Sequence, residues 1–310
     1  MRILFMGSGD VACPALERLV RQPDWEVVAV ITQPDRPKGR NRRLCACPAK
    51  ELAERHDVPV LTPEKVGKPE SIAAIEALNP DIIVVAAYGQ YISPKILKIP
   101  PLGAINIHPS LLPKYRGASP IQWALANGDQ ETGVTILYVS EEMDAGDIIL
   151  QRNVLIDPED TALTLTPRLA EIGADLLVDA LRLIEAGNAL RQPQDEVAVT
   201  TVYKLEKEDG RIDWQLPATV IHNRIRGFTP WPGGFTETSK GLLKVWKTQP
   251  VDGEPSVAPG TVVACDAEGP VIATGSGMLR LLEVQPEGKK AMSGKAYLCG
   301  HPWQPGDKLA

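Results

Sequence analysis

Residues 2–12 read RILFMGSGDVA, and this stretch decides the fold class. A strand, a glycine turn and a helix are expected in that order, because the apolar run ends at Gly7 and a helical pattern follows. Strand and helix patterns then alternate, which is typical of a Rossmann-like α/β fold: a mostly parallel sheet with helices on both faces. The expected strands cover 2–6, 25–32, 58–61, 82–87, 103–108, 133–139 and 148–154, and the expected helices 13–21, 48–56, 70–78, 119–127 and part of 167–186.

The turn from Gly7 to Ala12 matches the pattern G-x-G-x-x-A, which some dinucleotide-binding proteins share. A dinucleotide site also needs an acidic residue at the end of the second strand, and Thr32 and Gln33 stand there instead. A tight turn or an anion-binding helix start explains the glycines equally well. A nicotinamide-dependent oxidoreductase therefore remains only a weaker alternative.

A change of pattern predicts the domain organisation. Residues 1–187 carry the alternating strands and helices and form the expected catalytic domain. Residues 188–204 are mixed and polar, with a proline at Pro193, and are interpreted as a linker. Residues 205–310 hold short strands separated by Gly-Pro, Asp-Gly and Pro-Gly pairs, which predicts a small C-terminal β-barrel of OB-like type.

Length and composition agree with two globular domains. The chain has 310 residues, of which 44% are hydrophobic and 23% charged, and its net charge is −6. No apolar run approaches the ~20 residues that span a bilayer, and the N-terminus leaves no room for a signal peptide, so we expect a cytoplasmic protein without a membrane partner. The five cysteines and four histidines show no disulfide or ligand spacing, so we expect no metal site.

Asn106 and His108 lie two residues apart at the predicted carboxyl end of a strand. Period-two alternation places both on one face, at the sheet edge where open α/β sheets bind ligands. An amide beside an imidazole suits acyl chemistry, because the amide can donate to a developing oxyanion and the imidazole can donate, accept or carry charge near neutral pH. For these two residues alone, a buried structural histidine would be the simpler explanation.

An acidic turn between two later strands favours the catalytic interpretation. Asp144 precedes Ala145 and Gly146, and the glycine allows a sharp turn that aims the carboxylate inward. A carboxylate beside His108 would orient the imidazole and fix its tautomer. Glu141 and Glu142 are expected to be solvated surface acids.

These residues together resemble the 10-formyltetrahydrofolate-dependent formyltransferases. The resemblance rests on Asn106, His108, the run Ser110 to Pro113 and the turn Asp144 to Asp147, and it is supported by residues 32–37, 210–214, 228–232 and 288–293. It implies three catalytic residues, Asn106, His108 and Asp144, and folate contacts from Ser110, Leu111, Leu112 and Pro113. It also implies that the glycine turn holds no nucleotide.

The resemblance further implies the reaction and its partners. A formyl group would pass from 10-formyltetrahydrofolate to the amino group of initiator methionyl-tRNA, for translation initiation and without a metal; we expect a monomer. Another formyltransferase, acting on an amino-sugar nucleotide, would use the same three residues and is the nearest alternative. A non-catalytic RNA-binding module is a third alternative, although it would not need these residues together.

Five bases and no acid lie between Arg36 and Arg43. Prolines and a glycine exclude a helix, so the segment is interpreted as a reaching loop. Its bases, Arg36, Lys38, Arg40, Arg42 and Arg43, would contact tRNA phosphates, and the resemblance implies that they grip the acceptor arm. A merely solvated charged face is the alternative. A second expected RNA contact is formed by bases of the C-terminal domain, Arg224, Arg226, Lys240, Lys244 and Lys247.

Overall fold

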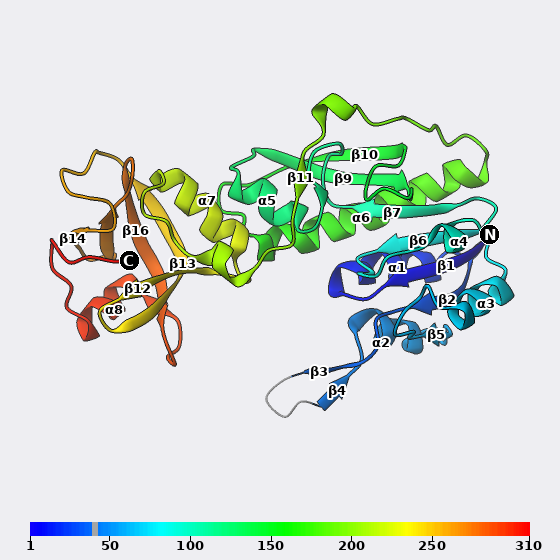
Figure 1. Ribbon diagram of the computed structural model, residues 1–310, viewed down its shortest axis with the longest axis horizontal. Coiled ribbons are helices and arrows are strands. Elements are labelled where there is room, and N and C mark those ends of the chain that lie inside the picture. Colours follow the sequence, from blue (N-terminus) through cyan, green and yellow to red (C-terminus); the bar gives the residue numbers. More distant parts are fainter. Residues whose placement is uncertain (39–42) are drawn as a thin grey trace. The chain divides into compact units, whose positions relative to one another are not determined.

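The computed structural model describes residues 1–38 and 43–310 (Figure 1). The chain forms two compact units. The first consists of Met1–Gly117, Glu131–Leu155 and Thr166–Thr201, and the second of Ala118–Gln130, Ile156–Leu165 and Val202–Ala310. The division at residues 187 and 205 that the sequence suggests stays a prediction.

A seven-stranded sheet forms the centre of the first unit (Figure 1). Five strands are parallel, and β9 and β10 continue the sheet in antiparallel pairing at one edge. The mostly parallel sheet predicted from the sequence is therefore confirmed. Its order is β10 (Ile148–Leu155), β9 (Glu131–Tyr138), β7 (Ala104–His108), β6 (Ile82–Ala86), β1 (Arg2–Gly7), β2 (Glu26–Ile31) and β5 (Val60–Leu61).

Helices cover the sheet, and the side chains of the central strand β1 are buried on both of its faces. Leu4 and Met6 pack in one core cluster with Ile75 and Ile96 from two of the helices. The alternate residues, such as Phe5, point to the opposite face and are equally buried. The helices of the described residues in this region are α1 (Cys13–Val20), α2 (Pro48–Arg55), α3 (Pro69–Leu78), α4 (Pro94–Leu97) and the long α6 (Ala162–Glu185).

The glycine turn after β1 is explained by packing. A Cβ at Gly7 would lie 2.7 Å from both the Ala86 carbonyl oxygen and the Phe5 ring, and 2.9 Å from the Cβ of Ala12. Residues 10–12 form a short 3₁₀ helix (Asp10–Ala12) before α1. The close approach of neighbouring chain segments thus requires glycine at this position, whether or not a ligand binds.

The basic segment forms a β-hairpin where it is described. β3 (Arg36–Lys38) pairs with β4 (Arg43–Cys45) in antiparallel register, so strands form at both ends of the segment that the sequence predicted as a loop. Proline is tolerated here because a two-stranded ribbon consists only of edge strands. At its base, Lys50 on α2 donates to both carboxylate oxygens of Asp35, at 3.0 and 2.9 Å.

The second unit contains the predicted C-terminal β-domain, which is confirmed as an antiparallel sheet of six strands. Its core joins the sheet to helix α7 (Ala218–Phe228) through Ile221, Ile225, Val245 and Leu281. A Cβ at Gly227 would lie 2.7 Å from the Gln122 carbonyl oxygen, so glycine lets α7 pack closely on α5 (Pro120–Ala126). The strands are β12 (Gly234–Thr238), β13 (Gly241–Val251), β14 (Val262–Cys265), β15 (Pro270–Ala273), β16 (Met278–Pro286) and β17 (Met292–Ser293), followed by α8 (Gly294–Gly300).

Further short elements are 3₁₀ helices at Glu196–Ala198 and Lys207–Gly210, and the strand pair β8 (Arg116–Gly117) and β11 (Thr201–Val202). None of the helices in residues 1–38 and 43–310 has the length and apolar character needed to cross a membrane.

His222 on α7 is expected to make the second unit sensitive to acid. Burial, and then the positive charge of Arg226, lower the pKa of His222 below its ordinary 6.5, and its Nδ1 lies 3.0 Å from Thr248 Oγ1. The unfolded chain binds this proton more readily, so the free energy of unfolding should decrease as the pH falls below 6.5. Denaturant unfolding between pH 8 and 5 measures this, and His222→Gln should flatten the dependence. An identical pH dependence in the variant would contradict the assignment.

Candidate functional site

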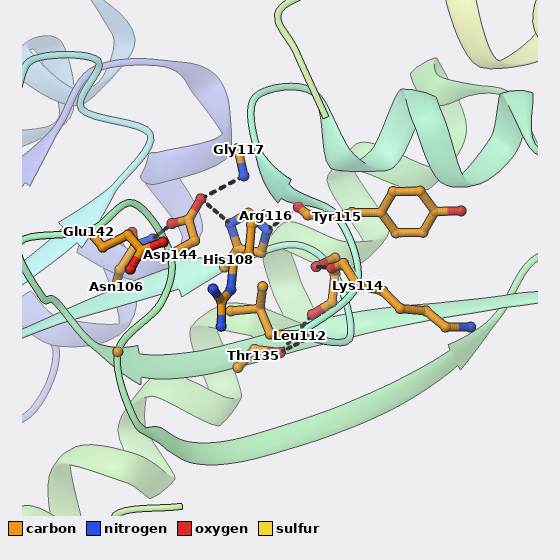
Figure 2. Close-up of polar contacts among 12 residues, drawn as sticks. Asn106, His108, Leu112, Lys114, Tyr115, Arg116, Gly117, Thr135, Glu142 and Asp144 are labelled. Carbon is orange, nitrogen blue, oxygen red and sulfur yellow. Dashed lines mark hydrogen bonds and ion pairs between the residues drawn. The ribbon is translucent and has the colours of Figure 1, made fainter. Parts of the chain in front are cut away.

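The carboxyl end of β7 brings Asn106, His108 and Asp144 together (Figure 2). Asn106 pairs in register with Val85 of β6, and both Asn106 and His108 lie on one face of β7, as the alternation predicted. The Asn106 amide nitrogen donates to Asp144 Oδ1 at 3.4 Å, and His108 Nδ1 lies 3.6 Å from Asp144 Oδ2. One carboxylate thus contacts both the amide and the imidazole.

Backbone geometry fixes the Asp144 carboxylate. Asp144 itself has φ 54°, in the left-handed region, and its Oδ2 accepts a hydrogen bond from the Gly117 N–H at 2.9 Å. A Cβ at Gly146 would lie 1.8 Å from the Tyr138 carbonyl oxygen, so only glycine permits this close approach of the turn to β9. Glu141 and Glu142 are exposed, in agreement with their interpretation as surface acids.

His108 is held by a second partner that the sequence did not reveal. Its side chain is buried, and Nε2 lies 2.9 Å from the Tyr115 carbonyl oxygen (Figure 2). Tyr115 presents this carbonyl from a left-handed conformation, with φ 64°. A carbonyl and a carboxylate both accept, so the ring can donate to both neighbours only with a proton on each nitrogen. The contact on the Nδ1 side, to Asp144, is the longer of the two.

The run from Ser110 to Pro113 begins two residues after His108, and two of its residues already make hydrogen bonds within the protein. Ser110 is fully buried, and its hydroxyl donates to the Lys114 carbonyl at 2.6 Å. Leu112 is also buried, and its N–H donates to Thr135 Oγ1 at 3.2 Å. Leu111 and Pro113 are half-buried. The side chains of Leu111 and Pro113 are therefore accessible to a ligand, whereas Ser110 and Leu112 are buried and stabilise the conformation of the loop.

Residues of the predicted linker also reach this site, and no sequence pattern pointed to them. Gln194 donates to the Asp144 and Gly146 carbonyls, and the buried Arg116 binds Gln194 and Glu196. Gln194 sits in a mixed polar stretch with no periodicity, which is why its role could not be read from the sequence.

The predicted RNA-binding bases are only partly described. Arg36 is exposed, and it approaches Gln33 Oε1 at 3.5 Å. Lys38 and Arg43 lie opposite each other in the hairpin, whereas Arg40 and Arg42 lie outside the described residues. The structure therefore leaves their assignment a prediction.

Two bases of the C-terminal domain, Arg226 and Lys247, make contacts within the second unit, and the RNA contact expected of this group of bases stays a prediction. Arg226 donates to the carbonyl oxygens of Asp157, Pro158 and Asp160 at 3.2 to 3.4 Å. Lys247 donates to Glu159 at 2.9 Å. Arg226, half-buried, therefore serves the packing of this unit.

Over residues 1–38 and 43–310, no group of three or more His, Cys, Asp or Glu side chains is arranged to hold a metal ion.

Comparison with known proteins links this site to a family. A family model described as formyl transferase matches residues 1–181, and a second, described as the formyl transferase C-terminal domain, matches residues 204–302. The methionyl-tRNA formyltransferase of Geobacter metallireducens is 44% identical over 314 residues, which covers 100% of this chain and 98% of that protein. The methionyl-tRNA formyltransferase of Citrifermentans bemidjiense is 44% identical over 309 residues, covering 100% and 96%.

A solved structure supports the fold. The N-formyltransferase of Helicobacter canadensis, crystallised with folinic acid and dTDP-3-aminofucose, superposes with a TM-score of 0.66 and 18% identity, covering 90% of this chain and 98% of that one. At this identity the likeness concerns the arrangement of the chain alone.

Proposed function

Since the chain belongs to the formyl transferase family, we propose that it transfers the formyl group of 10-formyltetrahydrofolate to the amino group of methionyl-tRNA. The product is N-formylmethionyl-tRNA, the initiator of translation, and the reaction takes place in the cytoplasm. The observation that carries the proposal is the 44% identity with methionyl-tRNA formyltransferases over the full length of this chain. The chemistry of the β7 edge supports it independently, because amide, imidazole and carboxylate are the groups that formyl transfer needs.

The reaction joins the amine to the formyl carbon directly. The free amine attacks that carbon, a C–N bond forms, and the carbonyl electrons move onto oxygen to give a tetrahedral oxyanion. The amide of Asn106 and the Nδ1–H of His108 donate to this oxygen, which lowers the barrier because charge develops there in the transition state. When the bond to N10 breaks, the oxygen returns to a carbonyl, and the products are a formamide and tetrahydrofolate.

Asp144 has two tasks in this scheme. Its carboxylate keeps the amide of Asn106 and the ring of His108 in one orientation, through contacts at 3.4 and 3.6 Å. It also accepts the proton that the attacking amine must lose and, through water, returns it to N10 of the departing folate. The number of protons on the protein is then unchanged at the end of each turnover.

The donor lies on the Leu111–Pro113 side of the site, and the acceptor approaches along the basic hairpin. The run Ser110 to Pro113 forms the folate side of the site: Leu111 and Pro113 contribute side chains, and Ser110 and Leu112 hold the loop in place through Lys114 and Thr135. The bases between Arg36 and Arg43 bind phosphates of the acceptor arm. A single copy of the chain holds all these groups, so the enzyme acts as a monomer.

A comparison of acceptors tests the proposal. The protein is incubated with 10-formyltetrahydrofolate and, in separate reactions, with methionyl-tRNA, an amino-sugar nucleotide and glycinamide ribonucleotide. Formylation of methionyl-tRNA with a kcat/KM at least about 10³-fold above that for the other acceptors is expected. Preferred formylation of the amino-sugar nucleotide would replace the proposed acceptor, and tRNA binding without turnover would favour an RNA-binding module.

Arg40→Ala is expected to weaken the use of tRNA and to leave the KM for folate unchanged. Each lost phosphate contact should reduce the slope of log affinity against log salt by about one unit or less, because fewer counterions are released. Turnover against tRNA concentration at several salt concentrations measures the slope. Arg21→Ala, which removes an exposed base directly after α1 that pairs with Glu17, is the matched control. An equal slope in the wild type and in Arg40→Ala would exclude Arg40 from the tRNA contact.

A further inference from the structure

We propose that Gln194 is a positioning residue, which holds the turn that carries Asp144 in its catalytic conformation. Gln194 lies in the stretch that the sequence presents as a linker. Its amide nitrogen donates two hydrogen bonds, to the Asp144 carbonyl at 2.7 Å and to the Gly146 carbonyl at 2.8 Å. These two donations use both protons of one amide group and tie both sides of the turn to a single side chain.

The turn needs such a clamp because its backbone is strained. Asp144 adopts φ 54°, which a residue with a Cβ takes up only at a cost in free energy. A strained conformation persists only where its surroundings hold it in place. Gln194 supplies that hold on the carbonyl side, while the Gly117 N–H holds the carboxylate on the other. A released turn would relax and carry the carboxylate away from His108 and Asn106.

The orientation of Gln194 is itself determined by buried Arg116. The Arg116 Nε donates to Gln194 Oε1 at 3.0 Å, so the amide oxygen must face the guanidinium and the amide nitrogen must face the turn. The two terminal nitrogens of Arg116 donate to Glu196 at 3.3 and 2.8 Å. This contact also lowers the pKa of the Glu196 carboxyl, since it stabilises the ionised form. Glu196, Arg116 and Gln194 thus form one chain of hydrogen bonds that ends at the Asp144 turn.

The same segment also fixes the loop that holds His108. Thr200 Oγ1 accepts from the Tyr115 N–H at 2.8 Å, and the Thr200 carbonyl accepts from the Arg116 N–H at 2.8 Å. The Tyr115 carbonyl is the partner of His108 Nε2. Residues 194–200 therefore set the positions of both the carboxylate and the imidazole, and we infer that they act on catalysis without contacting either substrate.

Two substitutions test this inference, which rests on the proposed function for its assay. Gln194→Ala removes the whole clamp. Gln194→Glu keeps its shape and its acceptor for Arg116 but cannot donate to the two carbonyls. Each should lower kcat about 10- to 100-fold and change the KM for either substrate less than about threefold, because a small displacement of a reacting group acts on the chemical step. Gln192→Ala is the matched control, since Gln192 is exposed and pairs with Ile148 through its backbone.

A double-mutant cycle separates positioning from a general loss of stability. In an Asp144→Asn background, Gln194→Glu should have less than a twofold further effect on kcat, because the group that it positions is already gone. An undiminished effect in that background, or wild-type kcat in both single variants, would overturn the inference. The measurements use the acceptor that the wild-type enzyme formylates, so a failure of methionyl-tRNA as acceptor would count against the proposed function and not against the role of Gln194. If Gln194→Ala does not fold, the kcat of Gln194→Glu, alone and in the Asp144→Asn background, decides whether the inference holds.

Discussion

Replacement of His108 by alanine is expected to lower kcat about 10²- to 10³-fold. The substitution removes one of two donors to the oxyanion, and the loss of a single donor of this kind typically has an effect of that size. The KM for tRNA should change little, since the bases that we propose to bind phosphates lie elsewhere in the chain. Steady-state formylation of methionyl-tRNA at saturating folate measures the effect.

The control for this variant is His56→Ala. His56 is also a histidine of the first unit, but it is exposed and pairs with Glu17 on the surface. The loss of His108 also leaves the Tyr115 carbonyl without its imidazole partner, so the melting temperature of the variant has to be recorded beside its kcat. A folded His108→Ala protein with near-native turnover would remove His108 from the mechanism.

Asp144→Asn is expected to have a similarly large effect, with kcat reduced about 10²-fold or more. Asparagine has nearly the same shape but lacks the charge and the second acceptor oxygen. It cannot accept from Asn106 and Gly117 at once while also facing His108, and it cannot take the proton of the amine. The comparison requires single-turnover rates, because product release can conceal a slower chemical step.

Asp147→Asn supplies the matched control for this second variant. Asp147 belongs to the same acidic turn, is half-buried and lies 3.9 Å from Arg191. It should retain more than about half of the wild-type rate. An equal loss of rate in the two variants would show that the turn tolerates no change of charge. The effect of Asp144→Asn would then be no evidence for a catalytic role of Asp144.

The sequence predicted the sheet and the face of its catalytic strand well, because both depend on local periodicity. Strand β1 is apolar and buried on both sides from Ile3 to Met6, and Asn106 and His108 share a face because they are two residues apart. The antiparallel pairing of β9 with both β7 and β10 could not be predicted, since a strand has the same periodicity in either direction. The hairpin at Arg36 was missed for another reason: its strands are three residues long, too short for any periodicity.

The groups that hold the catalytic side chains were largely invisible in the sequence. His108 is anchored by the carbonyl of Tyr115, and Asp144 by the N–H of Gly117; every residue except proline carries both groups, so their type gives no signal. Gln194 contacts Asp144 across 50 positions of sequence. Such long-range polar contacts appear only once the chain is folded, whereas the chemistry of Asn106, His108 and Asp144 can be read directly from their residue types.

The most direct test is a single-turnover experiment with a radiolabelled formyl group. It asks whether the methionyl amine attacks formylated folate directly within this site. Enzyme and labelled 10-formyltetrahydrofolate are mixed with methionyl-tRNA and quenched at intervals. We predict that the label passes from folate to methionyl-tRNA at the rate of turnover, never resides on the protein, and moves at least about 10²-fold more slowly with Asp144→Asn. Label that accumulates on the protein before tRNA is added, and then reaches tRNA at the full rate, would contradict direct transfer.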